Sequence, residues 1–335
     1  MNSGRSGWLV RLFVFALFLL VLAAGGLAYR LASPYQGFSH EVFLNFEKGT
    51  STSSMAQQLA AAGVIRRRWD FLLVRALQPR ARLQAGEYRF ASPVSVWTVF
   101  DRIVRGDVFY YEVTIPEGSN IFDIAQILDK LGFIKGPDFL KLARSPALIA
   151  DLSPHAPSLE GYLFPSTYRL TRRTTAAQIA RMMTDLFRRR WQELHKPGTV
   201  DVNRAVTLAS IVEKETGISG DRPRVASVYV NRLRLGMTLD CDPTTIYAAL
   251  LENRYRGVIH RSDLENDNAY NTYRHAGLPP GPIANPGAAS LEAALQPAQT
   301  DFLYFVAKPD GSGQHWFSTT LAEHNHHVQE YRHGR

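Results

Sequence analysis

The fold of this chain is organised around the stretch LASIVEKET, residues Leu208–Thr216. Asp201 and Asn203 precede it as candidate helix N-caps, and Gly217 follows it as a typical helix terminator. The residues between these marks are apolar on nearly every side of a helical projection. The stretch therefore predicts a buried helix that carries charge only in its last turn.

Two glutamates, Glu213 and Glu215, close that last turn. Burial and the negative end of the helix dipole both raise the pKa of a carboxyl group there, and a general acid must stay protonated near neutral pH. Helical spacing places Glu215 on the face of Val212 and Leu208, whereas Glu213 lies well around the helix. We expect Glu215 to be the general acid. A solvated helix end is the alternative for an isolated Glu-Lys-Glu string.

Composition limits the classes of protein that this chain can be. Its 335 residues with 45% hydrophobic side chains predict a folded protein of two domains or three small ones. The net charge of +8 favours an anionic partner, such as nucleic acid, anionic lipid or a cell-wall polymer. No zinc-finger or RNP motif supports nucleic acid, and the lone Cys241 has no partner for a disulfide or metal site. We therefore expect no nucleic-acid partner, metal or cofactor.

The N-terminal region predicts a membrane anchor. Residues 12–30 are an apolar run about long enough to span a bilayer, and Arg5 and Arg11 precede it. The positive-inside rule then places residues 1–11 in the cytoplasm and the rest of the chain outside. This predicts a single-pass inner-membrane protein with a periplasmic body. The alternative is a cleaved signal peptide, because 26–28 is a small-residue site.

From about Phe43 the chain contains an internal repeat. Each copy predicts a short strand, a glycine turn, an amphipathic helix, a glycine stop, a second helix, an aromatic strand and a further helix. The aromatic strands are expected at 86–90 and 166–170. The order of elements in the first copy resembles LysM carbohydrate-binding modules, which predicts a LysM-like domain over 40–108. A plain spacer between the membrane and the remaining chain is the alternative.

The rest of the chain predicts mixed helices and strands, so we assign an α+β fold. The elements expected after Gly217 are a helix at 225–235, a turn at 239–242 that enters a helix at Pro243, a Pro/Gly-rich loop at 277–287, a helix at 290–295, strands at 302–306 and 315–318, and a helix at 321–331.

Aromatic, amide and acidic side chains gather in and near these loops. Such side chains commonly hold sugar rings, and a ligand groove is typically aromatic with a few polar groups. The candidate substrate-binding residues are Glu213, Asp242, Tyr247, Tyr270, Asn271, Tyr273, Glu160 and Tyr162. Ser210 has no nucleophile elbow around it, and His324, His326 and His327 lack zincin spacing. We interpret these histidines as surface or substrate-edge residues.

Five blocks of sequence carry a family resemblance. They are 209–216, 225–237, Asp242-Pro243-Thr244, Tyr270-Asn271-Thr272-Tyr273 and 277–283, in that order, and 303–306 with Phe317 and Asn325 continues the series. Together they resemble the endolytic murein transglycosylases, the YceG-like family. One departure is Pro165-Ser166-Thr167-Tyr168, where the family pattern has Pro-Asp-Thr-Tyr. It argues against an essential carboxylate at position 166.

The resemblance implies cleavage of the MurNAc–GlcNAc β-1,4 bond in peptidoglycan glycan strands without water. Glu215 would protonate the glycosidic oxygen and then deprotonate the MurNAc 6-hydroxyl, which leaves a 1,6-anhydro end. It also implies a catalytic domain at 109–335 with a lysozyme-like core. The implied partners are glycan strands and peptidoglycan synthases (penicillin-binding proteins) at the inner membrane. Glu215-Thr216 resembles the Glu-Ser of lysozyme-like transglycosylases, which favours Glu215 over Glu213.

Two other functions stay open from the residues. A muramidase that uses water would need a second carboxylate, for which Asp242 and Glu160 are the candidates. A non-catalytic peptidoglycan-binding scaffold would use the repeat alone. The mass of the products separates the three functions, because a transglycosylase leaves anhydro ends, a hydrolase leaves reducing ends and a scaffold cuts nothing.

Overall fold

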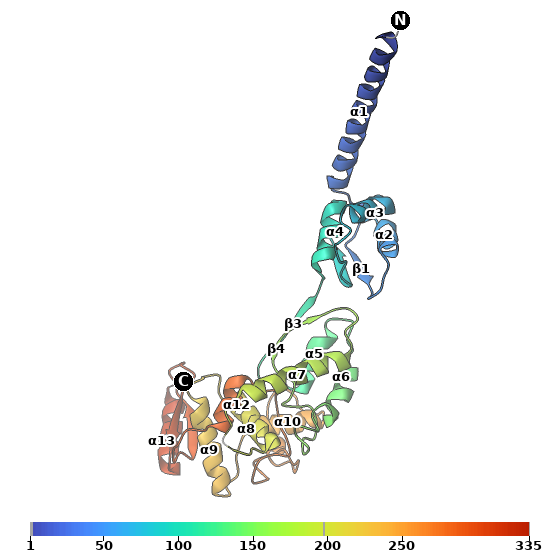
Figure 1. Cartoon of the computed structure of the whole chain (residues 1–335). Helices are drawn as coiled ribbons and strands as arrows, with labels where there is room; N and C mark the ends of the chain where they lie inside the picture. The colour runs from blue at the N-terminus through green and yellow to red at the C-terminus, as the bar shows by residue number, and fades with distance from the viewer. Residues whose placement is uncertain (1–2, 197, 335) are drawn as a thin grey trace. The chain divides into compact units, whose positions relative to one another are not determined.

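The computed structural model describes residues 3–196 and 198–334. The chain divides into two compact units, Met1–Tyr111 and Glu112–Arg335 (Figure 1). The described residues form helices and three two-stranded sheets, and an apolar helix comes first. The prediction of an α+β chain that begins with an apolar helix is therefore confirmed.

Helix α1 (Ser3–Ala32) contains the apolar segment. Its part from Val10 to Ala32 is 23 residues long and has a mean hydropathy of 2.5, and its residues before the last turn are not buried against other described residues. This length and composition are sufficient to cross a membrane, and they also fit a signal anchor. The helix continues two residues beyond the expected end of the anchor at 30.

The body of the smaller unit is built from two strands and three helices. They are β1 (Val42–Phe46), α2 (Thr52–Ala61), α3 (Arg68–Leu77), β2 (Gly86–Phe90) and α4 (Val96–Arg105). Strand β1 pairs antiparallel with β2, so that Val42 lies opposite Phe90. Aromatic side chains fill the core between the sheet and the helices, with Phe71 and Phe100 5.4 Å apart between ring centroids.

The last turn of α1 belongs to this body. Leu31 is only 3% exposed and packs in the same apolar cluster as Phe46 and Phe100. The guanidinium of Arg30 forms an ion pair with the buried carboxylate of Asp70 in α3, with 2.5 Å between Nη2 and Oδ1. Because the helix end contributes to the core, α1 joins the body without a flexible linker.

The first half of the larger unit repeats the element order of the smaller one. It contains β3 (Tyr111–Ile115), α5 (Ile121–Asp129), α6 (Gly136–Ala143), a 3₁₀ turn (Pro146–Leu148), β4 (Ser166–Leu170) and α7 (Ala176–Glu193). Strand β3 pairs with β4 in a second two-stranded sheet. Capping boxes at Asn120 and Thr175 begin α5 and α7. The predicted repeat is thus confirmed in the order of its elements.

The second half is organised around α8 (Val202–Glu215). The elements after it are α9 (Arg222–Arg234), α10 (Asp242–Leu251), α11 (Arg261–Leu264), α12 (Ala288–Leu295), β5 (Tyr304–Ala307), β6 (His315–Ser318) and α13 (Leu321–His333). Helices α9, α10 and α12 pack around α8 (Figure 1). Seven consecutive residues of α8, from Val206 to Val212, are buried, as its apolar composition predicts. Asp201 is its N-cap and accepts a hydrogen bond from the Arg204 amide.

We predict that residues Arg30 and Leu31 stabilise the smaller unit. A shortened chain that begins at Pro34 lacks both, so it should unfold at lower urea concentration than one that begins at Tyr29. Truncating a buried leucine costs about 2–5 kcal/mol, and Leu31→Ala in the longer chain should reproduce most of the loss. Equal unfolding midpoints for all three chains would show that the end of α1 is not part of the core.

Candidate active site

Glu215 lies at the end of α8, and its side chain is half-buried. Burial raises the pKa of this carboxyl group, and the negative charge of Asp242 raises it further. Hydrogen bonds from the Cys241 thiol, at 3.1 Å from Oε1, and from the Tyr229 hydroxyl act in the opposite direction. The net shift is upward, so Glu215 can hold a proton at higher pH than an ordinary glutamate does.

Glu215 opens onto a cavity of about 440 Å³. Residues from α8, α9, α10, β5 and α13 surround this cavity: Glu215, Tyr229, Arg232, Leu239, Asp240, Asp242, Tyr273, Tyr304, Phe305, Leu321, His324 and Asn325. The lining joins aromatic rings to several charged and amide groups, which is the composition expected of a carbohydrate site. We refer to it as the Glu215 cavity.

The turn before α10 is held by hydrogen bonds and brings Cys241 next to Glu215. Asp240 has a φ of +49°, the left-handed conformation that aspartate tolerates better than most residues. The amide of Cys241 donates to the hydroxyl of Thr272, and the carbonyl of Cys241 accepts from Thr244 at 2.6 Å. These bonds hold the Cys241 thiol against the Glu215 carboxyl group.

Arg232 supports the opposite wall of the cavity. Its guanidinium donates to the carbonyls of Leu303 and Leu239, at 2.7 and 3.1 Å, and to the carboxylate of Asp240 at 3.1 Å. It also stacks over the ring of Tyr304, 5.1 Å from the centroid. The side chain therefore joins β5 to the turn before α10, and so it keeps the walls of the cavity together.

Three predicted site residues come together in the Glu215 cavity. Besides Glu215 they are Asp242, at the first position of α10, and Tyr273. The Tyr273 hydroxyl donates to Asp242 Oδ1 at 2.7 Å. Asp242 is exposed to solvent, whereas Glu215 is half-buried, so the two carboxyl groups are in different environments.

Glu213 lies away from this cavity. Its carboxylate pairs with Arg222 of α9 at 3.2 Å and accepts the amide of Gly287, the N-cap of α12, at 3.0 Å. The side chain is only 6% exposed. Glu213 thus fastens α8 to two neighbouring helices, and the separation of the two glutamates agrees with their helical spacing.

Glu160 is a second buried carboxyl group, and it too lies outside the Glu215 cavity. It accepts hydrogen bonds from the Ile121 amide at 2.9 Å, from Asn285 Nδ2 at 2.8 Å and from the Tyr247 hydroxyl. Burial raises the pKa of Glu160 to about 8 despite these donors. Tyr247 in turn contacts the ring of Tyr270, 5.1 Å between centroids. Glu160, Tyr247 and Tyr270 therefore form an internal cluster that ties α5, α10 and two loops together.

Asn271 is placed differently from our expectation of a groove residue. Its side chain is fully buried, and its Nδ2 donates to three carbonyls of the 263–266 segment, of which that of Asn266 is nearest at 2.7 Å. Its Oδ1 accepts from the amide of Tyr273. Carbonyls turned inward by an irregular loop need donors, and Asn271 supplies them. Tyr162 is also fully buried and was also expected to bind substrate. Its hydroxyl is hydrogen-bonded to Ser153 and Asn203, so it too has a structural role.

Several residues of the Glu215 cavity were not predicted from the sequence. Tyr229, Arg232 and Tyr304 lie in the blocks 225–237 and 303–306 of the family resemblance, but they were not assigned to the site. His324 stacks on the Tyr304 ring, 5.3 Å between centroids, which agrees with a residue at the edge of a site. Asn325, beside it, had been identified only through the family resemblance.

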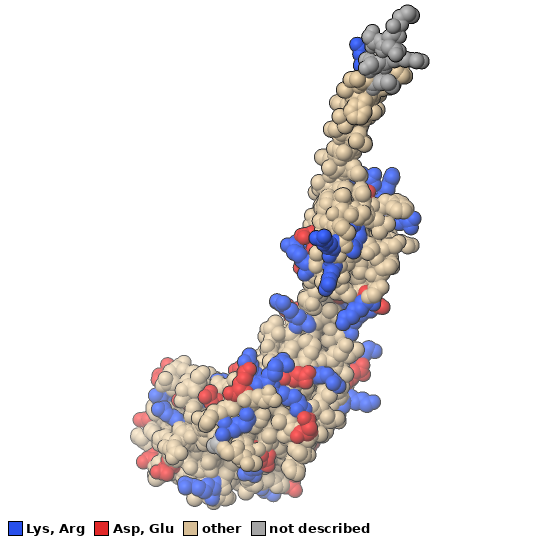
Figure 2. All heavy atoms as spheres, in the orientation of Figure 1, with Lys and Arg blue, Asp and Glu red and all other residues tan. Residues whose placement is uncertain are grey.

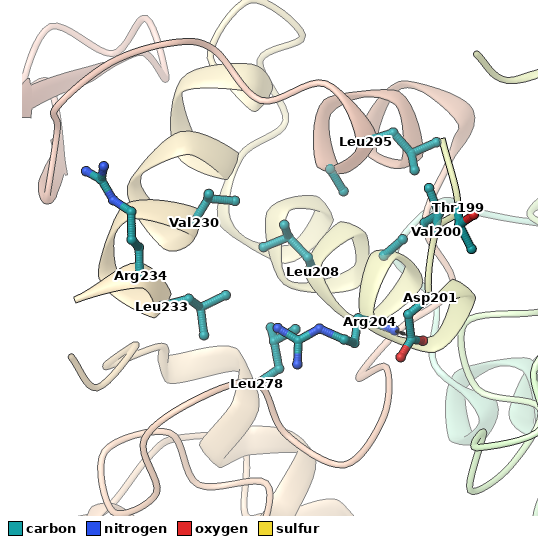
Figure 3. A pocket seen from close by; sticks show the side chains of 12 residues that line it. Thr199, Val200, Asp201, Arg204, Leu208, Val230, Leu233, Arg234, Leu278 and Leu295 are labelled. Carbon is teal, nitrogen blue, oxygen red and sulfur yellow. Dashed lines mark hydrogen bonds between the residues drawn. The ribbon is translucent and has the colours of Figure 1, made fainter. Parts of the chain in front are cut away.

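A larger cavity of about 550 Å³ lies between α8, α9 and α12 (Figure 3). Leu208, Val230 and Leu233 point toward one another there, and Arg204 and Arg234 lie at its edge. Its one acidic lining residue, Asp201, caps α8. This cavity has no buried or half-buried acid, so the Glu215 cavity is the better candidate active site despite its smaller volume.

Known proteins are similar to this chain over most of its length. The profile of the YceG-like family matches residues 44–330. The endolytic murein transglycosylase of Bacillus subtilis is 34% identical over 310 residues, which cover 87% of this chain and 84% of that protein. The endolytic murein transglycosylase of Streptococcus pneumoniae is 27% identical, over 95% of this chain and 64% of the relative.

A solved structure is also similar. The crystal structure of a YceG-like protein from Listeria monocytogenes aligns with a TM-score of 0.54 at 31% identity. The alignment covers 86% of this chain and 99% of the Listeria chain. The similarity therefore extends over most of the chain.

We predict that Asn271→Ala lowers the free energy of unfolding by about 1–3 kcal/mol, because it leaves buried loop carbonyls without donors. Asn325→Ala is the matched control, since Asn325 is exposed on the cavity wall and should change stability little. Urea unfolding of both variants measures the difference. A small effect of Asn271→Ala on stability would contradict the structural role given to this amide.

Proposed function

Because the chain belongs to the YceG-like family, we propose that it is a lytic transglycosylase that cuts peptidoglycan glycan strands internally. The bond cleaved is the MurNAc–GlcNAc β-1,4 linkage, and the products carry 1,6-anhydroMurNAc ends that limit strand length. The observation that carries the proposal is a half-buried glutamic acid of raised pKa, Glu215, that opens onto an aromatic and polar cavity.

In the first step Glu215 acts as the general acid. Its proton passes to the glycosidic oxygen, the bond between that oxygen and C1 of MurNAc breaks, and the leaving GlcNAc gains a hydroxyl group. Burial favours this step because it keeps the carboxyl group protonated before the reaction. The hydrogen bonds from Cys241 and Tyr229 then stabilise the carboxylate that remains.

In the second step the same carboxylate acts as the base. It removes the proton of the MurNAc 6-hydroxyl, and that oxygen attacks C1 of its own sugar to close the anhydro ring. Glu215 is thereby protonated again, so one carboxyl group completes the cycle without water. We assign substrate contacts to Asp242 and Tyr273. The other candidate residues do not line the Glu215 cavity, and we assign them a structural role in the protein around it: Glu213, Glu160, Tyr162, Tyr247, Tyr270 and Asn271.

The proposal extends to the arrangement of the chain. We infer that α1 is a single-pass inner-membrane anchor with the body in the periplasm, for which the arginines at 5 and 11 before the apolar segment are the support. The smaller unit would be a LysM-like glycan-binding domain, and the larger would contain a lysozyme-like core. Peptidoglycan synthases at the membrane would supply the nascent strands.

We predict that Glu215→Gln abolishes formation of anhydro products, because glutamine keeps the shape but has no proton to transfer. The loss of rate should be at the upper end of the range of about 10²–10⁴-fold for general acid–base catalysis, or beyond it. Mass spectrometry of digested sacculi measures the products. The fold should be kept, as judged by the unfolding midpoint.

Glu213→Gln is the matched control on the same helix turn. It weakens the ion pair with the buried Arg222 and so should lower stability, while folded molecules keep most of their activity. An inactive Glu213→Gln beside an active Glu215→Gln would reverse the assignment. Activity in both variants would exclude the mechanism.

We also predict that Tyr229→Phe moves the alkaline limb of kcat/KM to higher pH. Activity requires protonated Glu215 and is lost as the pH rises through its pKa. The Tyr229 hydroxyl lowers that pKa by stabilising the carboxylate, so removing it raises the pKa. Tyr304→Phe, on the same cavity but without a bond to Glu215, should leave the limb unchanged. A shift to lower pH in Tyr229→Phe would contradict this.

The placement of Asp242 beside Glu215 keeps a two-carboxylate muramidase as the second candidate. Glu160 is a poor second carboxylate, because it is fully buried outside the cavity. A hydrolase leaves reducing ends that are heavier than anhydro ends by one water. Reducing ends from the wild type, with their loss in Asp242→Asn, would favour hydrolysis over the proposed reaction.

A further inference from the structure

A group of arginines surrounds the point where α1 leaves the smaller unit. Arg30 is in the last turn of α1, and Arg66, Arg67 and Arg68 are consecutive residues at the start of α3. The last three side chains are all exposed. Figure 2 shows Lys and Arg side chains on the smaller unit close to the end of α1. The surface of α1 itself is largely uncharged in this view. We call these four residues the basic collar.

The basic collar borders a cavity of about 330 Å³. Its lining residues are Tyr29, Arg30, Ser33, Arg66 and Arg67. No carboxylate contributes to this lining, and two separate segments of the chain supply its arginines. A cavity of this volume with several guanidinium groups has the size and charge to receive a phosphate ester.

The arginines of the collar are mostly not neutralised within the protein. Arg30 pairs with Asp70, but its Nε is buried without a hydrogen-bond partner among the described residues. No ion pair in the described part of the chain joins Arg66, Arg67 or Arg68 to an acidic residue, whereas Arg105 of the same unit pairs with Asp101 at 2.7 Å. The collar therefore has unused capacity for an anion.

Aromatic side chains accompany the arginines. Trp69 is 63% exposed with the Arg68 guanidinium 4.9 Å from its ring, and Tyr29 is 78% exposed on the surface of α1. Arg66 lies over the ring of Tyr35, 4.6 Å from the centroid. Tryptophan and tyrosine are enriched where a protein meets the lipid headgroups, so they suit the same surface as the arginines.

The geometry holds the collar at the end of the apolar segment. Because Leu31 is packed in the core and Arg30 is bonded to Asp70, the start of α3 is fixed relative to the last turn of α1. If α1 spans the membrane, as proposed above, its last turn lies at the headgroup level. The basic collar is then at that level too, on a rigid support.

We propose that the basic collar binds the headgroups of anionic phospholipids, with a lipid phosphate in the cavity between Arg30, Arg66 and Arg67 and with Trp69 in the interface. This inference rests on the proposed anchor and adds a second contact with the membrane. It holds the smaller unit against the lipid surface. Basic residues near an anionic surface each strengthen binding by roughly fivefold at moderate ionic strength, and salt weakens the effect.

The test uses the full chain in nanodiscs of phosphatidylcholine alone or with one quarter phosphatidylglycerol. Lipids brominated near the headgroup quench tryptophans at the interface, and the difference between wild type and Trp69→Phe isolates the contribution of Trp69. We expect at least a severalfold larger Trp69 contribution with phosphatidylglycerol than without it. High salt, or the double variant Arg67→Glu/Arg68→Glu, should reduce that contribution to the phosphatidylcholine level.

Arg82→Glu/Arg105→Glu is the matched control. It makes the same change in charge at exposed positions of the same unit. Both positions lie near the C-terminal end of α4, about 15 Å along the helix from its start, which faces α1. It should leave the quenching of Trp69 unchanged. Co-elution of every variant with nanodiscs measures insertion of α1 separately, so a failed anchor is distinguished from a failed collar.

Two outcomes would overturn the proposal. The first is equal Trp69 quenching in both lipid compositions with no effect of the Arg67/Arg68 reversal, which would mean that α1 alone sets the contact. The second is quenching that depends on a polyprenyl diphosphate added to phosphatidylcholine and not on phosphatidylglycerol. That result would assign the collar to a lipid-linked glycan carrier instead.

Discussion

The partial burial of the Glu215 side chain at the end of α8 is the constraint on which the larger unit depends. An apolar helix must be covered on every side, and α9, α10 and α12 provide that cover. The same packing partly buries the Glu215 side chain and so raises its pKa. Stability and electrostatics thus share one cause, since the packing that covers Val206–Val212 also raises the pKa of Glu215.

Glu160 shows why a raised pKa does not by itself identify a catalytic group. Burial raises the pKa of both Glu160 and Glu215, and both accept hydrogen bonds from the protein. Glu160, however, is enclosed among Ile121, Asn285 and Tyr247, where its oxygens join separate parts of the fold. Glu215 opens onto a cavity of about 440 Å³. Access to a cavity, and not the direction of the pKa shift, distinguishes Glu215 from Glu160.

The smaller unit depends on a contact of another kind. Leu31 and Arg30 make the end of α1 a part of its core, so a helix that could span a membrane is joined rigidly to a folded body. This continuity gives the exposed arginines near α1 a defined height relative to the apolar segment. A flexible linker of the same composition would leave that height undetermined.

Local pattern was sufficient for much of this protein. The spacing of apolar and turn residues predicted the apolar segment of α1, the repeated order of strands and helices, the limits of β2, β4 and β6, and the different faces of Glu213 and Glu215. These features follow from the sequence because hydrophobic periodicity and turn chemistry act between near neighbours in the chain. The set of residues that line the Glu215 cavity, in contrast, could be determined only from the tertiary structure. It brings Tyr229, Tyr304 and Asn325 to Glu215 and turns Asn271 inward, because such contacts join residues far apart in the chain and leave no local pattern.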